Sequence, residues 1–382
     1  MPFDMQGRKC LVVGAGFFGA TIAERIAQDA DAPVLVIDQR DHIGGNCYSE
    51  RDQQTGIEFH KYGTHIFHTE DRTVWDYISR FTAFNGYRHQ VLTTHKNKVY
   101  QMPINLETIN SFYGKTLKPF EVKAFLADEI AREGIAEPRN LEEMAISLVG
   151  RPLYEAFIKG YTEKQWEKDP VDLPAAIIER LPFRHDYAEN YYFDRWQGIP
   201  LDGYTRIFER LLEHKNIEVR LGVDFFAVRK DLSDDCLVVY TGPLDRYFDY
   251  QFGRLESRTL RFEKEVVAVG DFQGTSVMNY ADRDIPYTRI HEPRHLHLER
   301  DYPRGKSLIF REFPQLGTAE SPFYPINTPK NNECAARYKK EREKHPNVVF
   351  GGRLADYEYC DMDRTIAKAL ETYRTQIKPR LK

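Results

Sequence analysis

The 382-residue sequence lacks several features that would assign it to common classes of protein. It contains no uninterrupted run of 18 apolar residues, so the sequence offers no candidate for a transmembrane helix. It has no surplus of basic residues, because 54 Lys and Arg stand against 58 Asp and Glu and give a formal charge of −4. A surface that binds nucleic acid needs such a surplus. The charge therefore argues against nucleic acid but leaves room for a local basic pocket that binds a small anion.

Cysteine is scarce, and no two cysteines form the Cys-x-x-Cys pair of a zinc site or redox motif. The odd, scattered set indicates reduced thiols in a cytoplasmic protein and argues against a bound metal. We expect buried, inert side chains at all five positions, which are Cys10, Cys47, Cys236, Cys334 and Cys360. The early apolar segment, residues 10–20, holds three glycines and runs into a polar helical pattern. We therefore expect it in the mature protein and not in a signal peptide.

The chain shows no repeat of 20–50 residues and no low-complexity tract, and instead alternates between helical and strand-like patterns. Residues 73–150 are mostly helical, with an alternating stretch near 89–102, and residues 237–313 are mostly strand-like. A short apolar strand at 347–350 precedes a final helix. One helix has clear end signals: Asn140 as N-cap, Glu143 as the partner in a capping box, and Gly150 as terminator.

The first β-α-β unit has the spacing of a dinucleotide-binding motif. An apolar strand at residues 9–13 leads into Gly14-Ala15-Gly16-Phe17-Phe18-Gly19 and a helix, and the second strand ends at Asp38. Gly14 permits the tight turn, Gly16 the approach of a pyrophosphate and Gly19 the packing of helix on strand, while Asp38 would accept hydrogen bonds from a ribose. The helix N-terminus would face the phosphates. The pattern favours a dinucleotide site over a glycine turn of purely structural use.

A second glycine turn, Gly44-Gly45-Asn46, follows soon after Asp38 and Gln39. This continuation resembles the FAD-binding segment of amine-oxidase-like flavoproteins, and no second Gly-x-Gly-x-x-Gly supplies a separate NAD(P)H domain. Near the C-terminus, Gly351-Gly352-Arg353 precedes a helix from about Asp361, whose positive N-terminal end would stabilise an anionic reduced flavin. We therefore expect non-covalent FAD that is active when reduced.

Several further phrases, spread from Cys10 to about Ala369, resemble the bacterial UDP-galactopyranose mutase family. Each is weak alone, and together they are specific. The phrases are Lys61-Tyr62-Gly63-Thr64-His65-Ile66-Phe67-His68-Thr69, Gly160-Tyr161-Thr162-Glu163-Lys164-Gln165-Trp166, Gly198-Ile199-Pro200, Gly203-Tyr204-Thr205, Thr241-Gly242-Pro243-Leu244-Asp245, Val277-Met278-Asn279-Tyr280, Pro286-Tyr287-Thr288-Arg289-Ile290, and Gly352-Arg353-Leu354 with Tyr357, Tyr359, Asp361, Met362 and Asp363.

The resemblance implies an α/β fold in which a Rossmann-like FAD-binding domain is joined by a helical insertion and a six-stranded antiparallel sheet domain. A mobile lid is expected near 160–180. The expected boundaries are 1–72, 203–235 and 338–382 for the FAD-binding domain, 73–86 and 104–182 for the helical domain, and 87–103, 183–202 and 236–337 for the antiparallel sheet domain.

The resemblance also implies an activity: isomerisation of UDP-galactopyranose to UDP-galactofuranose without net redox change, for cell-wall polysaccharide biosynthesis. Flavin N5 of the reduced cofactor would attack the anomeric carbon and release UDP. Formation of an iminium would then open the ring, and reclosure would give the furanose. This is covalent catalysis by a cofactor, for which the protein supplies orientation and electrostatics.

A diphosphate leaving group needs cations at its oxygens, and arginine binds such oxygens through a planar fork. The resemblance assigns this role to Arg180 and Arg289, with Arg184 as the alternative to Arg180. The tyrosine hydroxyls expected to complete the diphosphate site are those of Tyr191, Tyr324 and Tyr359. Without the family pattern, the alternative to diphosphate binding is an exposed surface position for an arginine and packing in the core for Tyr191.

At the nucleotide end, the resemblance assigns the uridine contacts and the lid to Phe157, Tyr161, Thr162 and Trp166, although Trp166 alone could be a buried anchor. Asn279 and His89 would contact the nucleotide-sugar. His65 is expected beside flavin N5, where it would steer protonation and act with Arg180 and Arg289 in catalysis. Two departures from the family pattern are Thr64 and Cys360. The expected cofactor contacts are Gly14, Gly16, Phe18, Gly19, Asp38, Gln39, Gly45, Asn46, His65, Ile66, Arg353, Cys360, Asp361, Met362 and Asp363.

Two other functions remain to be weighed. A flavin oxidoreductase of the amine-oxidase or desaturase type shares the FAD frame, but its uncharged or cationic substrates give no reason for paired arginines with three tyrosines. A non-catalytic nucleotide-binding regulator gives no reason for His65 and residues 353–363 to line a flavin. For the mutase, the expected partners are the UDP-sugar, an external reductant such as NAD(P)H, and further copies of the chain in a homo-oligomer.

Overall fold

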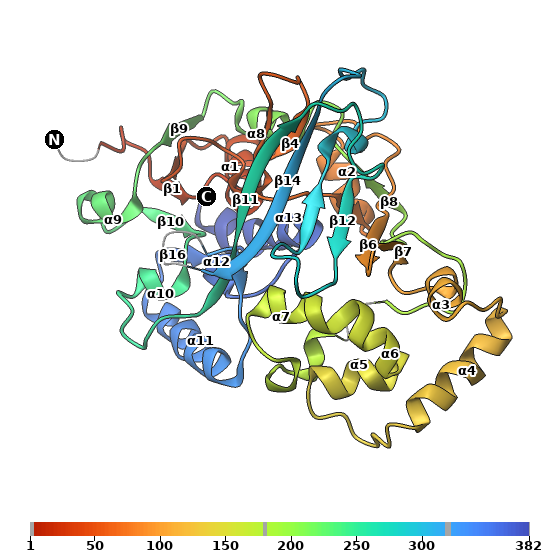
Figure 1. The fold of residues 1–382 in the computed structure, drawn as a ribbon. Helices are drawn as coiled ribbons and strands as arrows, with labels where there is room; N and C mark the ends of the chain where they lie inside the picture. The colour runs from red at the N-terminus through yellow and green to blue at the C-terminus, as the bar shows by residue number, and fades with distance from the viewer. Residues whose placement is uncertain (1–3, 179–181, 318–321, 382) are drawn as a thin grey trace.

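The computed structural model describes residues 4–178, 182–317 and 322–381, and its layout is drawn in Figure 1. The chain builds two sheets and a group of helices. Its first residues and its last helices lie together around a parallel sheet. The long strands β11 and β14 of a second sheet cross in front of that sheet, and helices α3 to α7 form a separate group at one side (Figure 1).

The parallel sheet has five strands in the order β16-β10-β1-β2-β9. The three inner strands β10, β1 and β2 are short apolar runs that are almost wholly buried, which is typical of a parallel sheet covered by helices on each side, whereas the edge strands β9 and β16 are partly exposed. Val12 and Val36 pack into one core cluster, whereas Leu11 and Leu35 pack into the other. The strands are β1 (Cys10–Val13), β2 (Val34–Asp38), β9 (Ile217–Leu221), β10 (Leu237–Tyr240) and β16 (Val348–Phe350).

Helices cover both faces of this sheet. The helix predicted after the glycine motif is α1, and the helix predicted near the C-terminus is α13, with Asp361 as its N-cap residue. On the first face lie α1 (Phe17–Asp29), α8 (Tyr204–Leu212) and α13 (Met362–Thr372). On the second face lie α9 (Phe225–Val228), α10 (Leu244–Tyr247), α11 (Pro329–Glu341) and α12 (Arg353–Asp356).

The structure moves two segments out of the domains in which the sequence places them. The expected sheet domain begins at 236, but β10 pairs in parallel with β1 and β16 because its four side chains are buried like those of its neighbours. The expected helical domain includes 73–86, but α2 (Arg72–Ile78) packs on α13 and the first core cluster. There the Tyr77 hydroxyl donates a hydrogen bond to Glu24 at 2.9 Å.

The second sheet has seven strands in the order β15-β11-β14-β13-β12-β6-β7. A six-stranded antiparallel sheet was the expectation; the observed sheet is larger and mixed, because β6 and β12 pair in parallel. Its strands are β6 (Val91–His95), β7 (Lys98–Met102), β11 (Ser257–Val267), β12 (Val277–Tyr280), β13 (Arg289–His291), β14 (Ser307–Leu316) and β15 (Tyr324–Pro325).

The separate helical group has its own apolar core. In α5 the predicted cap is confirmed, since the Asn140 side chain accepts the Glu143 N–H at 2.9 Å, but the Glu143 carboxylate accepts the N–H of Arg139 and does not return to Asn140. Gly150 follows the last residue of α5 as predicted. The helices are α3 (Leu106–Tyr113), α4 (Pro119–Ala131), α5 (Leu141–Val149), α6 (Arg151–Leu153), a π-helical turn at Tyr154–Lys159, and α7 (Gly160–Trp166).

Two small strand pairs complete the framework, β3 with β4 and β5 with β8. They are β3 (Ser49–Arg51), β4 (Glu58–His60), β5 (Phe67–Thr69) and β8 (Trp196–Gly198). The loop between β4 and β5 carries Thr64 and His65, and so connects the parallel-sheet region to the site described below. Among the described residues, no helix has the length and apolar character that a bilayer span requires.

Candidate functional site: a dinucleotide cavity beside an arginine–tyrosine cluster

The glycine motif forms a tight backbone crossing between β1 and α1. Gly14 has φ of +107°, and a Cβ there would lie 2.0 Å from the Thr241 hydroxyl oxygen. A Cβ on Gly19 would lie 2.0 Å from the carbonyl oxygen of Gly14. Side chains at these positions would separate the strand from the helix. Within the described part of the chain, no side chain caps the N-terminus of α1, so its first N–H groups are available to an anion.

The second glycine turn packs directly on the first. The Gly44 N–H donates to the Ala15 carbonyl oxygen at 2.9 Å. Gly45 has φ of +56°, and a Cβ on it would approach the Gly16 Cα to 3.2 Å. The two backbones therefore form a narrow cradle that any larger residue would fill, which is the condition for close approach of a pyrophosphate.

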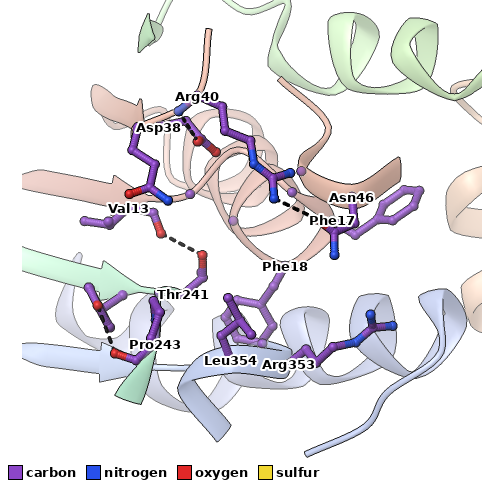
Figure 2. Close-up of a pocket in the computed structure, with 18 of the residues that line it drawn as sticks. Val13, Phe17, Phe18, Asp38, Arg40, Asn46, Thr241, Pro243, Arg353 and Leu354 are labelled. Atoms are coloured by element: carbon purple, nitrogen blue, oxygen red, sulfur yellow. Dashed lines mark hydrogen bonds between the residues drawn. The ribbon is translucent and has the colours of Figure 1, made fainter. Parts of the chain in front are cut away.

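Charged side chains flank this cradle (Figure 2). The Asp38 carboxylate accepts the N–H groups of Ala15 at 2.8 Å and Arg40 at 2.9 Å, so its orientation is fixed at the end of β2. Arg40 donates through Nη2 to Asn46 Oδ1 at 2.9 Å. Its Nη1 is buried without a hydrogen-bond partner among the described residues. A buried cationic donor of this kind fits an anionic ligand.

The cradle opens into a cavity with an empty volume of about 1270 Å³, its open mouth included. Most of the predicted cofactor residues line it; the exceptions are Ile66, Asp361 and Asp363. Asp363 instead accepts a hydrogen bond from the Thr69 hydroxyl at 3.1 Å. The predicted residues that do line the cavity are Gly14, Gly16, Phe18, Gly19, Asp38, Gln39, Gly45, Asn46, His65, Arg353, Cys360 and Met362.

Sequence reasoning missed other parts of the wall. Thr241 lies in a phrase that was recognised without a role, and its hydroxyl donates to the Val13 carbonyl at 2.7 Å (Figure 2). Arg246 reaches Asp224 at 2.7 Å and Gln39 at 3.2 Å. These residues come from segments far from the glycine motif, and only the pairing of β10 with β1 brings them to the cavity.

The C-terminal segment closes the far end of the cavity. Gly351 fits against the Phe18 ring, since a Cβ there would lie 2.1 Å from the ring. Arg353 donates through Nη2 to the Cys360 carbonyl at 2.7 Å, which holds the turn that precedes α13. Met362 and Thr365, in the first turn of α13, line the wall. The cavity thus lies between the N-terminal ends of α1 and α13.

His65 lies at the inner wall of this cavity. Its N–H donates to His60 Nδ1 at 3.0 Å, and its own Nδ1 lies 2.7 Å from the Gly63 carbonyl oxygen. Because a carbonyl only accepts, Nδ1 carries a proton and Nε2 is the free acceptor of the neutral ring. Burial lowers the pKa of His65 to about 4, although the hydrogen bond to Gly63 opposes the shift. The ring is therefore neutral near pH 7.

A second group of polar residues surrounds Arg289 on β13. Its Nε donates to Asn279 Oδ1 at 3.2 Å, and its Nη1 lies 3.6 Å from the carboxylate of Glu312. The Tyr161 ring lies 5.7 Å from the guanidinium. The Glu312 side chain is only 2% exposed, whereas that of Arg289 is 36% exposed. Burial alone would raise the pKa of Glu312, but Arg289 and hydrogen bonds from His291 and Thr288 hold it at about 2.

Of the tyrosines predicted for the diphosphate, Tyr324 and Tyr359 lie beside Arg353, and Tyr191 and Tyr324 are near enough to Arg289 to act on its charge. The Tyr324 and Tyr359 rings lie 5.8 Å apart, and the Arg353 guanidinium is 5.3 Å from the first and 5.1 Å from the second. Although burial opposes it, the pKa of Arg289 is raised by the nearby Tyr161, Glu312, Tyr191 and Tyr324. Arg353 therefore faces both the cavity and the Arg289 cluster.

His89 and Tyr191 form another side of the cluster. Their rings lie 5.5 Å apart, and the Tyr191 N–H donates to the His89 carbonyl at 2.8 Å. The His89 ring itself is buried, with Nδ1 3.0 Å from the Tyr87 hydroxyl. Burial, followed by the charge of Arg289, lowers the pKa of His89 to about 3. The ring is neutral and held in place.

The predicted uridine residues divide into two groups. Tyr161 reaches Arg289, but Phe157 packs with Tyr100 and Phe112 inside the helical core, and Phe157 and Thr162 are each only 6% exposed. Trp166 is half-buried against the same core. In this structure Phe157 and Thr162 are thus packing residues, a role that their apolar or small side chains suit as well as a ligand role.

Lys164 attaches helix α7 to the second sheet, beside ion pairs from Glu163 to Arg283 and from Glu167 to Arg258. Lys164 Nζ donates to the carbonyl oxygens of Tyr280 at 2.6 Å, Asp282 at 2.8 Å and Tyr287 at 3.1 Å. An ammonium group has three donors, so all are used. A Cβ on Gly160 would lie 2.5 Å from the Ala281 carbonyl oxygen, which lets the helix come this close. This attachment holds Tyr161 over Arg289.

Arg180, the second predicted diphosphate arginine, lies outside the described residues. Its alternative, Arg184, is 8% exposed and donates through Nη1 to the Ala188 carbonyl at 2.9 Å. Its guanidinium lies 4.3 Å from the Phe193 ring. Nε and Nη2 of Arg184 are buried without a hydrogen-bond partner among the described residues, and burial lowers its pKa.

The cysteines are all free thiols, as predicted, and four of the five are buried. Cys334 is the exception and is half-buried. Burial raises the pKa of both Cys10 and Cys47 to about 12, so these two thiols stay protonated at neutral pH. Protonated thiols are poor nucleophiles, which agrees with an inert role.

Comparison with known proteins first defines the class. Residues 12–81 match the model of an NAD(P)-binding Rossmann-like domain. A crystal structure of reduced UDP-galactopyranose mutase superposes with a TM-score of 0.72, at 13% identity over 98% of this chain and 99% of that one. A putrescine oxidase variant gives a TM-score of 0.55, at 12% identity over 97% and 99%. The chain therefore has a Rossmann-like dinucleotide-binding domain, within a fold that it shares with these two proteins.

The sequence comparisons give the family. Residues 156–359 match the UDP-galactopyranose mutase model. A probable UDP-galactopyranose mutase of Klebsiella pneumoniae is 42% identical over 96% of this chain and 94% of its own length, and a dTDP-fucopyranose mutase of Escherichia coli is 40% identical over 97% and 98%. The chain belongs to the UDP-galactopyranose mutase family, whose reaction is an isomerisation without net redox change. This confirms the resemblance and favours an isomerase over the oxidoreductase alternative.

The buried histidines predict how stability depends on pH. Burial lowers the pKa of His60 to about 3, against about 6.5 in an unfolded chain. Between these values the unfolded chain binds the extra proton, so stability falls as the pH drops below about 6.5. His60→Asn, which keeps an acceptor for the His65 N–H, should flatten this loss by up to about 1.4 kcal/mol per pH unit. Urea unfolding at pH 5 and pH 6 gives the change in the free energy of unfolding per pH unit for the wild-type protein and for His60→Asn. The same change in both proteins would contradict the prediction.

Proposed function

We propose that the protein interconverts UDP-galactopyranose and UDP-galactofuranose, with FAD as a non-covalent cofactor that must be reduced. The observation that carries this proposal is the position of Arg289 with Asn279, Tyr161 and Tyr324, directly beside a cavity built for a dinucleotide. A cation among hydroxyl and amide groups suits a diphosphate. Its position next to the dinucleotide cavity suits a reaction in which the sugar of that ligand meets the cofactor.

The fit of the chain to FAD supports the choice of cofactor. The Gly16–Gly45 cradle and the N–H groups at the start of α1 suit its pyrophosphate. Arg40 Nη1 has no hydrogen-bond partner in the part of the chain that the structure describes, and the first turn of α13 lies at the other end of the cavity. Asp38, fixed by two backbone N–H groups, would hold the adenosine ribose. When bound and reduced, the flavin supplies an electron-rich nitrogen for the anomeric carbon of the sugar.

The protein's own groups would do the remaining work. Arg289 has five N–H donors, so its contacts with Asn279 and Glu312 leave others for the β-phosphate oxygens. As the anomeric C–O bond breaks, negative charge grows on the departing UDP, and Arg289 stabilises that charge more than the charge of the bound substrate. Tyr191, Tyr324 and Tyr359 would donate hydroxyls to the same diphosphate. The second arginine of this site would be Arg180, or Arg184, two of whose buried nitrogens have no hydrogen-bond partner among the described residues.

His65 would control a proton at the inner end of the site. Its Nδ1–H is committed to the Gly63 carbonyl, so Nε2 is the atom that accepts or returns a proton on the cavity side. A ring that stays neutral near pH 7 can accept a hydrogen bond there without adding a positive charge. His89 would help to fix Tyr191, since the two are joined through the backbone and their rings pack together.

The lid assigned to residues 160–180 would close over the nucleotide through α7. The three carbonyls that receive Lys164 hold the helix against the turn between β12 and β13. Tyr161 then covers Arg289, and Trp166 lies one and a half turns further along the helix. Closing this segment removes water from the diphosphate, which strengthens the arginine contacts.

Several finer assignments go with this function. The sequence contains no second Gly-x-Gly-x-x-Gly motif that would indicate a separate NAD(P)H domain. We therefore expect an external reductant of the NAD(P)H type. We place the enzyme in the cytoplasm, where its five free thiols suit the reducing conditions. A homo-oligomer and a role in supplying galactofuranose for cell-wall polysaccharide complete the proposal.

The proposal is tested by turnover of UDP-galactofuranose with oxidised and with dithionite-reduced enzyme under anaerobic conditions. Only reduced enzyme should form UDP-galactopyranose, although both forms should bind UDP. dTDP-fucofuranose is assayed in parallel, because one relative is a dTDP-fucopyranose mutase of similar identity. A higher kcat/KM for the dTDP-sugar would change the assigned substrate. Equal turnover by the oxidised enzyme would reject the role of reduced flavin.

Replacing Arg289 should cost catalysis and not only binding. A hydrogen bond to a charged group is worth about 1.5–3 kcal/mol, so Arg289→Ala should lower kcat/KM by one to several orders of magnitude at about 1.4 kcal/mol per tenfold. Arg289→Lys should recover part of the loss, since it lacks the planar fork. Both variants should keep their FAD. Arg311→Ala, on the neighbouring strand and paired with Glu265, is the matched control. Full activity of Arg289→Ala would remove this residue from the site.

The lid should report nucleotide binding through Trp166. With Trp75 and Trp196 replaced by Phe, UDP should quench or shift the remaining fluorescence. Lys164→Met should raise KM several-fold and weaken this signal, because α7 loses its three carbonyl contacts, whereas Lys168→Met at an exposed position should not. A Trp166 signal that ignores UDP would show that this segment is not the lid.

A further inference from the structure

A continuous chain of polar side chains connects the loop that carries His65 to Arg289. Thr64 Oγ1 lies 2.8 Å from His291 Nδ1, and His291 Nε2 lies 2.9 Å from Glu312 Oε2. The other carboxylate oxygen of Glu312 is 3.6 Å from Arg289 Nη1. These four side chains come from the β4–β5 loop, β13 and β14, so the chain of contacts joins elements that are far apart in sequence.

The chemistry of these groups gives the contacts a direction. The carboxylate of Glu312 can only accept, so a neutral His291 carries its proton on Nε2 and donates it to Glu312. Nδ1 of the same ring is then an acceptor, and the Thr64 hydroxyl donates to it. Valine in place of Thr64 would keep the shape of the side chain but remove this donor, whereas serine would keep the donor.

The middle of the chain is shielded from water. The side chains of His291 and Glu312 are 5% and 2% exposed. Thr288 also donates to Glu312, from a fully buried position. Water therefore has little room to replace a lost partner, and each contact in a buried polar network affects its neighbours. A substitution at Thr64 should therefore alter the position of Arg289, and a substitution at Arg289 should alter that of Thr64.

The two ends reach the two halves of the proposed site. Thr64 precedes His65 and follows Gly63, which has φ of +102° and would place a Cβ 3.2 Å from the Phe262 ring. The loop is thus pressed against the second sheet and fastened to it by Thr64. At the other end, the Glu312 carboxylate sets the position of the Arg289 guanidinium.

We propose that Thr64, His291 and Glu312 are positioning residues that couple the orientation of His65 at the dinucleotide cavity to that of Arg289 in the substrate site. None of the three has to touch the ligands. The coupling rests on the proposed function only for its kinetic consequence, because the contacts themselves belong to the protein. In the sequence, Thr64 is a departure from the family's pattern. Its hydrogen bond to His291 gives the hydroxyl a structural role.

A spectroscopic double-mutant cycle tests the coupling without an assay of activity. The imidazole resonances of His65 are measured by NMR in the FAD-bound protein labelled with ¹⁵N-histidine. Arg289→Lys should shift them in the wild-type background, and Thr64→Val should reduce that shift at least twofold. In a Thr64→Ser background the shift should persist. The same shift in all three backgrounds, or no shift in the wild-type background, would overturn the proposal.

Kinetics give a second, independent measurement. Thr64→Val should lower kcat several-fold with little change in KM, since it acts at the cavity end, while Thr64→Ser should stay within about twofold of wild type. Thr82→Val removes a hydroxyl that is bonded to the Ala83 carbonyl elsewhere, and serves as the control. Equal impairment of the valine and serine variants would assign Thr64 a role in packing alone. Failure of the wild-type protein to turn over the UDP-sugar would reject the proposed function. The NMR cycle would still show whether the positions of His65 and Arg289 are coupled through Thr64.

Discussion

The buried negative charge of Glu312 constrains the architecture of the substrate site. A carboxylate with 2% exposure is costly unless cations and donors compensate it. Here Arg289, His291 and Thr288 all approach it, and the register of β13 against β14 sets Arg289 directly opposite Glu312. The sheet therefore fixes the guanidinium from one side. The Arg289 side chain as a whole keeps 36% exposure, which would leave it accessible to the diphosphate of the proposed function.

The same logic explains why two sheets with different cores meet at one site. The parallel sheet supplies the cavity for the dinucleotide through its glycine crossings, where backbone must approach backbone. The mixed sheet supplies charged and hydroxyl side chains, for which its half-buried face is suited. The β4–β5 loop joins the two, because Thr64 is bonded to β13 and His65 faces the cavity. Neither sheet alone contains both halves of the site.

Local signals in the sequence predict local structure well. The glycine motif, the Asn140 cap and the α13 start depend on residues a few positions apart, and each is found where it was predicted. Likewise, the predicted cofactor residues that line the cavity come mainly from short motifs whose backbone conformation determines where they lie. Short-range rules of turns and helix ends therefore account for much of the dinucleotide cavity.

Short-range rules do not predict contacts between segments that are distant in the sequence. The parallel pairing of β6 with β12, the insertion of β10 beside β1, and the contact from Thr64 to His291 join residues roughly two hundred positions apart. Apolar pattern alone cannot choose between partners of similar character, so residues 73–86 and 237–240 were assigned to the wrong layers. Phe157 shows the same limit at the level of a single residue, since an aromatic side chain suits a uracil and a helical core equally well.

The positive charge of Arg353 lies between the dinucleotide cavity and the proposed substrate site, so the binding of the two ligands would be linked. The Arg353 guanidinium lies over the Tyr324 and Tyr359 rings, which we propose for the substrate side, while the residue also lines the cavity and bonds to the Cys360 carbonyl. One positive charge thus contributes to the potential at both places. An anion bound on either side changes the energy of charge on the other. Because such linkage is reciprocal, the reduced cofactor and the diphosphate of the proposed function would compete for this cation. In the proposed site, Arg289, which is held by Glu312, would relieve that competition by giving the diphosphate a cation of its own.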